Sequence, residues 1–269
     1  MSVPDISVVT PTFHRERQVV EAVRSALGQR GVSVEVTVLD DSPDGSARSA
    51  VEGIGDPRVR YVKRDVPTGG RPAIVRNEGA ALARGRYLHF LDDDDMLADG
   101  ALAALADALD RRSDIGVAFG IVVPFGEDEA VLRHQREFFA RATVVGRRIV
   151  GRRRVAARML FSDTPLVNSA CMIRRELFGQ LGGYDADLDV FEDVEFFMRA
   201  ARRFGIAFID RHVLHYRTGA PSLMHNLVEA REAGRKAYAH IYKKYRKEHG
   251  SVEFYALKVF ARVQSAVGL

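Results

Sequence analysis

The chain has 269 residues, of which 46% are hydrophobic and 28% charged, a composition typical of a globular protein with a sizeable core. Its length fits one large α/β domain or two small ones. The single cysteine, Cys171, excludes a disulfide framework within the chain, and its apolar surroundings favour a core residue over a nucleophile. No apolar run approaches the roughly 20 residues that span a bilayer, and no signal pattern opens the chain. We therefore expect a cytoplasmic protein.

The net charge of +4 is spread unevenly. Two basic segments stand out, the second interleaved with tyrosines: Arg147, Arg148, Arg152, Arg153 and Arg154, then Lys236, Tyr238, Tyr242, Lys243, Lys244, Tyr245, Arg246 and Lys247. Basic residues among aromatic ones are typical of surfaces that bind nucleic acid or anionic membranes, and a solvated helix face is the alternative. Because no motif that reads nucleic acid accompanies the charge, we keep the membrane surface and the solvated helix as the two interpretations.

The first hundred residues alternate apolar strands with amphipathic helices. The hydrophobic pattern predicts strands over 6–10, 34–39, 59–63 and 86–91, a further strand over 117–123, and helices over 16–29 and 73–83. This alternation favours an α/β fold, a mostly parallel sheet with helices on both faces. The pattern is less regular over 125–161, which resembles an insertion or an acceptor-side element. A glycine turn is predicted at 182–185, an acid-rich helix start at 191–199, and helix from 223 onwards.

Four consecutive aspartates, Asp92 to Asp95, follow the strand predicted at 86–91. Like charges packed together repel one another, and hard oxygen ligands suit Mg²⁺ or Mn²⁺, so the run predicts a divalent cation site. The alternative is that Asp94 or Asp95 caps a helix that begins near Met96. Capping accounts for one or two of the four acids.

A second acidic pair, Asp40 and Asp41, follows the strand predicted at 34–39. Ligands of parallel sheets bind beyond the carboxyl ends of the strands, where both acidic groups fall. Two acidic groups at one edge of a sheet favour a functional site over capping alone.

Six segments together resemble glycosyltransferase family 2, whose members use nucleotide sugars and have the GT-A fold. They occur in the family's order between about residues 3 and 220: Val8 to Phe13, Leu39 to Ser42, Arg76 to Gly79, Phe90 to Asp95, Gly182 to Asp185, and Glu192-Asp193. The resemblance implies a Rossmann-like sheet over 1–222, with a donor-binding part over about 1–123 and an acceptor part over about 124–222. A helical extension over 223–269 would follow.

On the donor side, the resemblance implies a Mn²⁺ or Mg²⁺ ion that bridges the diphosphate of the nucleotide sugar. Asp92 and Asp94 would hold the ion, and Asp92 or Asp93 would also contact the nucleotide. Asp41, with Asp40 beside it, would accept a hydrogen bond from the base. The remaining candidates are Thr10, Pro11 and Thr12 as walls of the nucleotide pocket, and Arg71 and Arg76 as guanidinium donors to base or phosphate.

On the acceptor side, a base must deprotonate the attacking hydroxyl. Asp193 matches the second residue of the family's Glu-Asp pair, and Glu192 is the alternative. One base opposite the leaving group implies inversion at the anomeric carbon. His215 lies where some relatives carry a metal-binding histidine, although a hydrogen-bonded strand histidine is the favoured interpretation.

Two departures bear on the activity. The usual Asp-Asp-Gly-Ser turn is Asp40-Asp41-Ser42-Pro43 here, and the Gln-x-x-Arg-Trp pattern of processive synthases is missing. We therefore expect transfer of a single sugar to a carbohydrate, lipid-linked or small-molecule hydroxyl acceptor, in polysaccharide or glycoconjugate synthesis. Peripheral contact with the inner face of the cell membrane and homodimer formation stay open. The rival functions are an inactive nucleotide-binding domain and a nucleotidyltransferase.

Overall fold

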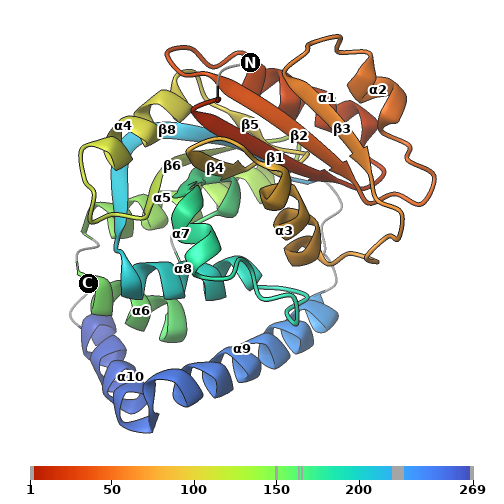
Figure 1. Cartoon of the computed structure of the whole chain (residues 1–269). Helices are drawn as coiled ribbons and strands as arrows, with labels where there is room; N and C mark the ends of the chain where they lie inside the picture. Colours follow the sequence, from red (N-terminus) through yellow and green to blue (C-terminus); the bar gives the residue numbers. More distant parts are fainter. Residues whose placement is uncertain (1–2, 149–150, 163, 165, 220–226, 267–269) are drawn as a thin grey trace.

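One eight-stranded sheet runs through the molecule (Figure 1). The structure, a computed structural model, describes residues 3–148, 151–162, 164, 166–219 and 227–266. The strands follow the spatial order β3-β2-β1-β4-β7-β6-β8-β5. Their bounds are β1 (Ile6–Thr12), β2 (Val34–Asp40), β3 (Val59–Lys63), β4 (Tyr87–Phe90), β5 (Met96–Leu97), β6 (Val117–Phe125), β7 (Cys171–Arg174) and β8 (Ile206–Arg217).

The first four strands are parallel, as the sequence predicts. β1 pairs with β2 on one side and with β4 on the other, and β2 pairs with β3. The second half of the sheet is mixed, because β7 runs antiparallel to both β4 and β6. The chain therefore places β2 and β3 on one side of β1 and β4 on the other side, so the order of the strands reverses between β1 and β4. In open α/β sheets, ligands bind beyond the carboxyl ends of the strands at such a point.

Helices cover both faces of the sheet, in agreement with the expected layering. One hydrophobic core joins the sheet to α1 (Glu16–Leu27), α2 (Arg48–Glu52), α4 (Ala101–Asp110) and α5 (Glu129–Arg148). The other joins it to α3 (Pro72–Leu82), α6 (Arg152–Phe161), α7 (Arg175–Gln180), α8 (Glu192–Arg203), α9 (Leu227–His249) and α10 (Ser251–Ala266). Neighbouring strand residues alternate between the two cores, Val8 in the first and Val9 in the second, as the two-residue repeat of a strand requires.

The segment after the four aspartates differs from the expectation. Met96–Leu97 forms the short strand β5 against β8, and α4 begins only at Ala101, after Gly100 in the left-handed conformation with φ 71°. The interpretation of Asp94 or Asp95 as a helix cap is therefore wrong. Residues 125–161 were expected to be irregular, but they contain α5 and α6, whose mixed charge reflects one face turned to solvent.

Helix α3 lies unusually close to the sheet because of Gly79. A Cβ atom at this position would lie 2.3 Å from a methyl carbon of Val9 on β1. The close approach is possible only without a side chain. It holds α3 against β1, so that Arg76, one turn earlier, is buried at the carboxyl end of the strands.

The carboxyl-terminal helices α9 and α10 lie along one end of the molecule, beneath α6 and α8 (Figure 1). Residues 223–226 lie outside the described part of the chain. The interpretation of this segment as a membrane surface does not extend to the three tyrosines of α9, because they pack inward. Tyr245 is fully buried, Tyr238 packs on Phe191, and Tyr242 packs on Phe254. Within the described residues, none of the helices combines the length and apolar character needed to cross a bilayer.

Candidate active site

The candidate site lies where β1 and β4 end side by side. The Thr12 hydroxyl, at the end of β1, donates a hydrogen bond of 2.8 Å to Asp93, which follows β4. The sheet topology thus brings together two segments that are 81 residues apart in the sequence. This hydrogen bond lies at the carboxyl ends of the strands, where the strand order reverses. We call this edge of the sheet the rim.

The four aspartates alternate between exposed and buried positions. The side chains of Asp92 and Asp94 are 34% and 19% exposed, whereas Asp93 and Asp95 are buried. Asp92 to Asp95 form a turn, in which the backbone amide of Asp95 donates a hydrogen bond of 3.2 Å to the carbonyl of Asp92. Because Asp93 and Asp95 are buried, only Asp92 and Asp94 of the run can offer oxygens toward the rim. Their spacing is that of the aspartate-any-aspartate pattern that the sequence indicated.

Arginine neutralises three of the four acids. Arg15 donates hydrogen bonds of 2.8 Å to Asp93 and 2.6 Å to Asp94, and Arg76 donates one of 2.6 Å to Asp92. Burial, opposed by the charge of Arg15, raises the pKa of Asp93 to about 6. Burial raises the pKa of Asp95 well above its usual range, and the neighbouring carboxylates add to this effect. The raised pKa favours the neutral form of Asp95, which carries no charge to repel the other carboxylates.

Arg76 connects the strand end to the start of α8. One terminal nitrogen of its guanidinium bonds to Asp92 and the other makes a short hydrogen bond to Glu192. Burial opposes the charged form of Arg76, but Asp92 and Glu192 outweigh it and raise its pKa. Both terminal nitrogens bond to carboxylates of the protein, so in this structure Arg76 holds Asp92 and Glu192 in position.

The two carboxylates of α8 have different surroundings. Glu192 is 5% exposed and held by Arg76, whereas Asp193 is partly exposed and accepts a hydrogen bond of 2.7 Å from the backbone amide of Val194. Burial raises the pKa of both groups, while the charge of Arg76 opposes the increase. A carboxylate with a raised pKa is a stronger base, and Asp193 is the more exposed of the two.

Asp40 and Asp41 close two loops beside the site. Asp40 accepts hydrogen bonds from the backbone amides of Ser42 and Ala47 and from the hydroxyl of Tyr61, at 2.8 to 3.0 Å. Asp41 is bound by Arg64 at 2.8 Å and by the Thr68 hydroxyl at 2.6 Å. The oxygens of this pair therefore bond within the protein, and Asp41 anchors the glycine-rich loop.

The remaining predicted residues lie around this centre. Thr10 is fully buried, Thr12 is 3% exposed, and Pro11 is partly exposed. Arg71 donates to the carbonyl of Ala186 and to Asp189, so it ties the glycine-rich loop to the turn before α8. His215 lies on β8 opposite Met96. Among the described residues, Asp92, Asp94 and His215 do not place three ligand atoms within 4.8 Å of one another.

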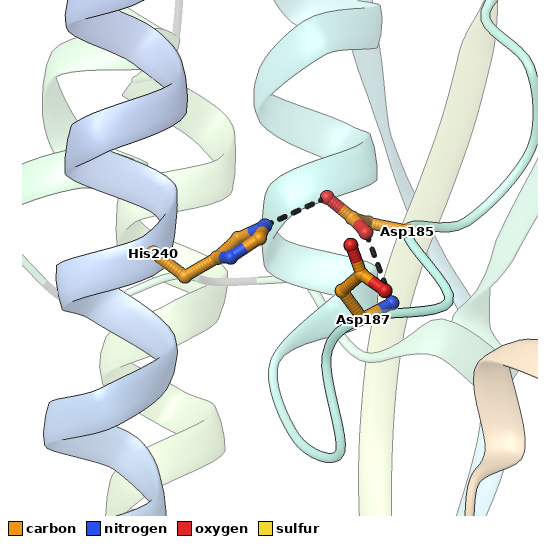
Figure 2. Close-up of side chains that lie close together, drawn as sticks. All are labelled: Asp185, Asp187 and His240. Atoms are coloured by element: carbon orange, nitrogen blue, oxygen red, sulfur yellow. Dashed lines mark hydrogen bonds and ion pairs between the residues drawn. The ribbon is translucent and has the colours of Figure 1, made fainter.

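The group that does meet this distance consists of Asp185, Asp187 and His240 (Figure 2). It lies between the turn before α8 and helix α9. One oxygen of Asp185 accepts hydrogen bonds from both His240, at 3.1 Å, and Lys244, at 2.7 Å. These donors outweigh burial and lower the pKa of Asp185 to about 2. The Lys244 ammonium already neutralises Asp185, so the group serves as a contact between this turn and α9.

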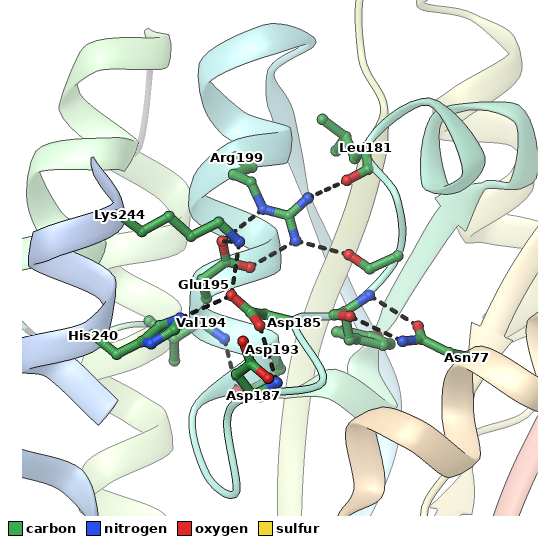
Figure 3. Close-up of polar contacts among 12 residues, drawn as sticks. Asn77, Leu181, Asp185, Asp187, Asp193, Val194, Glu195, Arg199, His240 and Lys244 are labelled. Carbon is green, nitrogen blue, oxygen red and sulfur yellow. Dashed lines mark hydrogen bonds and ion pairs between the residues drawn. The ribbon is translucent and has the colours of Figure 1, made fainter. Parts of the chain in front are cut away.

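The same contact supports α8 from behind (Figure 3). Lys244 also pairs with Glu195 at 2.9 Å, and Arg199 joins Glu195 to the carbonyls of Leu181 and Gly183. On the opposite side of the turn, Asn77 of α3 exchanges two hydrogen bonds of 2.9 Å with the backbone of Tyr184. The turn at 182–185 is thus held between α3, α8 and α9, and it fixes where α8 begins.

Three residues of the site were not predicted from the sequence. Arg15 neutralises two of the aspartates, the backbone amide of Arg217 donates to Asp95 at 3.0 Å, and the Ser169 hydroxyl accepts from the backbone amide of Asp92 at 3.1 Å. Arg15 follows the first predicted strand closely, which is the one available signal. Ser169 and Arg217 come from distant segments, and their spacing in the sequence indicates nothing about the site.

Comparison with known proteins shows the family. The family model described as Glycosyl transferase family 2 matches residues 7–182, more than half of the chain, and the chain belongs to that family. Two curated relatives match shorter segments. The succinoglycan biosynthesis protein ExoO of Rhizobium meliloti is 38% identical over 108 residues, which is 40% of this chain and 30% of that protein. A GalNAc(5)-diNAcBac-PP-undecaprenol beta-1,3-glucosyltransferase of Campylobacter jejuni is 35% identical over 104 residues, 38% of this chain and 33% of that protein.

Two solved structures have the same fold. The mannosyltransferase PcManGT from Pyrobaculum calidifontis, in complex with GDP-Man and Mn²⁺, aligns with a TM-score of 0.65 at 18% identity and covers 98% of this chain and 70% of that one. S. aureus TarS 1-349, in complex with UDP-GlcNAc, aligns with a TM-score of 0.62 at 17% identity and covers 96% of this chain and 79% of that one. The expected GT-A fold is therefore confirmed. The chain spans about a third of the length of the two curated relatives.

Proposed function

We propose that this chain is a metal-dependent, inverting glycosyltransferase that moves one sugar from a nucleotide-diphosphate sugar to a hydroxyl acceptor. The observation that carries the proposal is the bridge through Arg76, which joins Asp92 on the strand side to Glu192 beside Asp193. A transferase needs an anion-neutralising group for the leaving diphosphate and a base for the acceptor within one site. The two ends of this bridge meet these two needs.

The residues at the rim fit a divalent cation. Asp92 and Asp94 are hard oxygen donors, two positions apart, and both are partly exposed. When bound there, Mg²⁺ or Mn²⁺ neutralises the charge that develops on the departing diphosphate. The ion pairs with Arg15 and Arg76 keep these carboxylates in place. The structural neighbours solved in complex with GDP-Man and Mn²⁺ or with UDP-GlcNAc support a nucleotide sugar as donor.

Asp193 acts as the base in this mechanism. Its carboxylate takes the proton of the acceptor hydroxyl as the acceptor oxygen bonds to the anomeric carbon, and the bond from that carbon to the diphosphate breaks. A single displacement of this kind inverts the anomeric configuration. Glu192 is the poorer candidate because Arg76 occupies it and because it is buried. Arg76 instead holds Glu192 in place and so positions the first turn of α8.

The acceptor belongs to the chemistry of cell-surface glycans in this proposal. One relative is named for succinoglycan biosynthesis and another for a glucosyl transfer to an undecaprenyl-diphosphate-linked glycan. A carbohydrate or lipid-linked hydroxyl acceptor is consistent with both names.

The test measures nucleotide binding and turnover together. We expect a nucleoside diphosphate to raise the melting temperature with Mn²⁺ or Mg²⁺ but not in EDTA, since binding at a hundredfold excess over Kd stabilises by about 2.7 kcal/mol. Asp94→Ala should abolish the metal-dependent part of this shift, and Asp99→Ala, at an exposed acid nearby, should retain it. An equal shift in EDTA would remove the metal from the proposal. Slow hydrolysis of the donor sugar, without turnover of nucleoside triphosphates, would distinguish a transferase from a nucleotidyltransferase and from an inactive binding domain.

A further inference from the structure

Helix α10 carries an exposed apolar stripe. Ten large hydrophobic side chains are exposed among the described residues, and five of them lie on this one helix. They are Val252, Tyr255, Val259, Phe260 and Val263, exposed by 38 to 89%. The other five are scattered: Val3 and Phe13 lie before and after β1, Val66 lies in a loop, and Val131 and Val144 lie on α5. Exposed apolar side chains are ordinary when they are scattered, but a continuous group of them indicates an interaction surface.

The stripe follows the repeat of a helix. Its members recur at intervals of three or four residues and lie on one side, opposite the buried Phe254, Leu257 and Ala261. The buried side packs against α6 and α9, in the second core. Helix α10 is therefore apolar on two faces, and the described chain covers only one of them. A helix that is apolar all round is normally buried on both sides.

The charges beside the stripe are positive. Lys258 and Arg262 lie next to each other on one flank of α10 and stay partly or fully exposed. The one acid in the described part of α10, Glu253, is turned inward, where it pairs with Arg202 at 2.6 Å and accepts a hydrogen bond from Tyr245 at 2.9 Å. Two further exposed cations, Arg152 and Arg153, begin α6, the helix that packs on α10.

We propose that the exposed face of α10 docks on an anionic lipid bilayer. An amphipathic helix of this type lies in the plane of the interface, with its apolar side chains among the acyl chains and its basic flank against the headgroups. The flank favours this partner over a second copy of the chain. A two-fold interface would bring the same Lys258 and Arg262 toward their own equivalents, and like charges repel. The surface lies at the end of the molecule opposite β2 and β3 (Figure 1). It therefore places the proposed transferase at a membrane and takes no part in the transfer reaction.

Sedimentation with vesicles tests the docking surface. The full chain should sediment with vesicles of phosphatidylcholine and phosphatidylglycerol, and much less with phosphatidylcholine alone. Val259→Asp combined with Val263→Asp should lower the bound fraction at least about tenfold, because it places charge within the apolar stripe. Val144→Asp, at an exposed valine of α5, is the matched control and should bind as the unchanged chain does. Lys258→Gln with Arg262→Gln should weaken binding and reduce its dependence on salt.

The outcomes separate the possible partners. The stripe variants alter exposed positions, so melting temperature and nucleotide binding should stay unchanged and show that the fold is intact. Equal sedimentation of the stripe variants and the Val144→Asp control would overturn the proposal. A dimer in analytical ultracentrifugation that Val259→Asp dissociates, without vesicle binding by the unchanged chain, would assign the stripe to a second copy and also overturn it.

Discussion

Two groups of carboxylates meet at the rim of the sheet, and the protein neutralises them differently. At the strand end, Asp93 and Asp94 share the guanidinium of Arg15. At the helix start, Glu192 is bonded to Arg76, whereas Asp193 accepts a backbone hydrogen bond from Val194. At the strand end the charges are thus held in ion pairs with arginine. The helix start instead leaves one partly exposed carboxylate, Asp193, whose pKa is raised.

The largest effect expected from this difference is on the rate of transfer. Asp193→Asn should lower transfer by roughly 10² to 10⁴, the loss typical of removing a general base, with donor and metal affinity nearly unchanged. The amide has almost the same size as the carboxylate, so the fold should be retained. Donor affinity by calorimetry, measured beside the transfer rate, checks both statements.

Asp92→Asn is the comparison on the strand side and should weaken donor binding itself. If Asp193→Asn transfers sugar at nearly the original rate, the assignment of the base is wrong. Glu192→Gln is then the next variant to measure.

Removing Arg76, which connects the two groups of carboxylates, should lower the free energy of unfolding. Arg76→Met leaves Glu192 buried without its cation, and breaking a buried pair in this way typically costs roughly 3 to 5 kcal/mol. The free energy of unfolding from denaturant titration measures the loss. Arg111→Met removes a largely exposed ion pair with Asp107 and should change stability by at most about 1 kcal/mol.

A double variant distinguishes the lost pair from lost packing. If the buried charge of Glu192 causes the instability, Arg76→Met with Glu192→Gln should be more stable than Arg76→Met alone. Equal stability of the two would assign the loss to the packing of the arginine side chain.

The sequence predicted the strands and helices of the first half well, because each has a clear apolar repeat bounded by turn residues. It was least informative where contacts are distant. Met96–Leu97 follows an aspartate that resembles a helix cap, yet pairing with β8, more than 100 residues later, makes it a strand. At this position the pairing with a distant strand outweighs the local preference for a helix start.

The same distinction applies to the site. The residue types at Asp92, Asp94 and Asp193 predict a cation site and a base, and these roles stay predictions. The structure adds that Asp92 and Asp94 are the partly exposed members of the aspartate run. The partners of these residues were not predictable from spacing. That Arg76 faces inward toward Glu192 depends on the close packing of α3 at Gly79, which one sequence does not reveal.

A buried histidine beneath the strand end should make stability depend on pH. His89 is fully buried on β4, and burial lowers its pKa from 6.5 to about 4. Between these two pH values only the unfolded chain takes up the proton, so the free energy of unfolding should fall as the pH decreases from about 6.5 to about 4. This lowering of the pKa of His89 corresponds to a decrease of about 3 kcal/mol in the free energy of unfolding across that pH range.

His89→Leu should remove this dependence. The buried Asp93 has the opposite effect, because its raised pKa lets the folded chain take up a proton first. The informative quantity is therefore the difference between the variant and the unchanged chain across pH 4 to 8 in denaturant titrations. His134→Leu, at an exposed histidine of α5, should leave the pH dependence as it was. Parallel curves for His89→Leu and the unchanged chain would show that His89 does not titrate as described.

The smallest expected effect concerns the support behind the helix start. Lys244→Met removes the ion pairs from α9 to Asp185 and to the buried Glu195, at 2.7 and 2.9 Å. Because Arg199 still pairs with Glu195, and because the ammonium is partly exposed, we expect a loss of only about 1 to 2 kcal/mol in the free energy of unfolding. Lys236→Met, at a more exposed pair on the same helix, should cost less. Transfer by Lys244→Met should fall less than about tenfold, since α8 and Asp193 stay in place and only their support weakens. A decrease as large as that of Asp193→Asn, in a protein that remains folded, would instead mean that α9 belongs to the catalytic machinery.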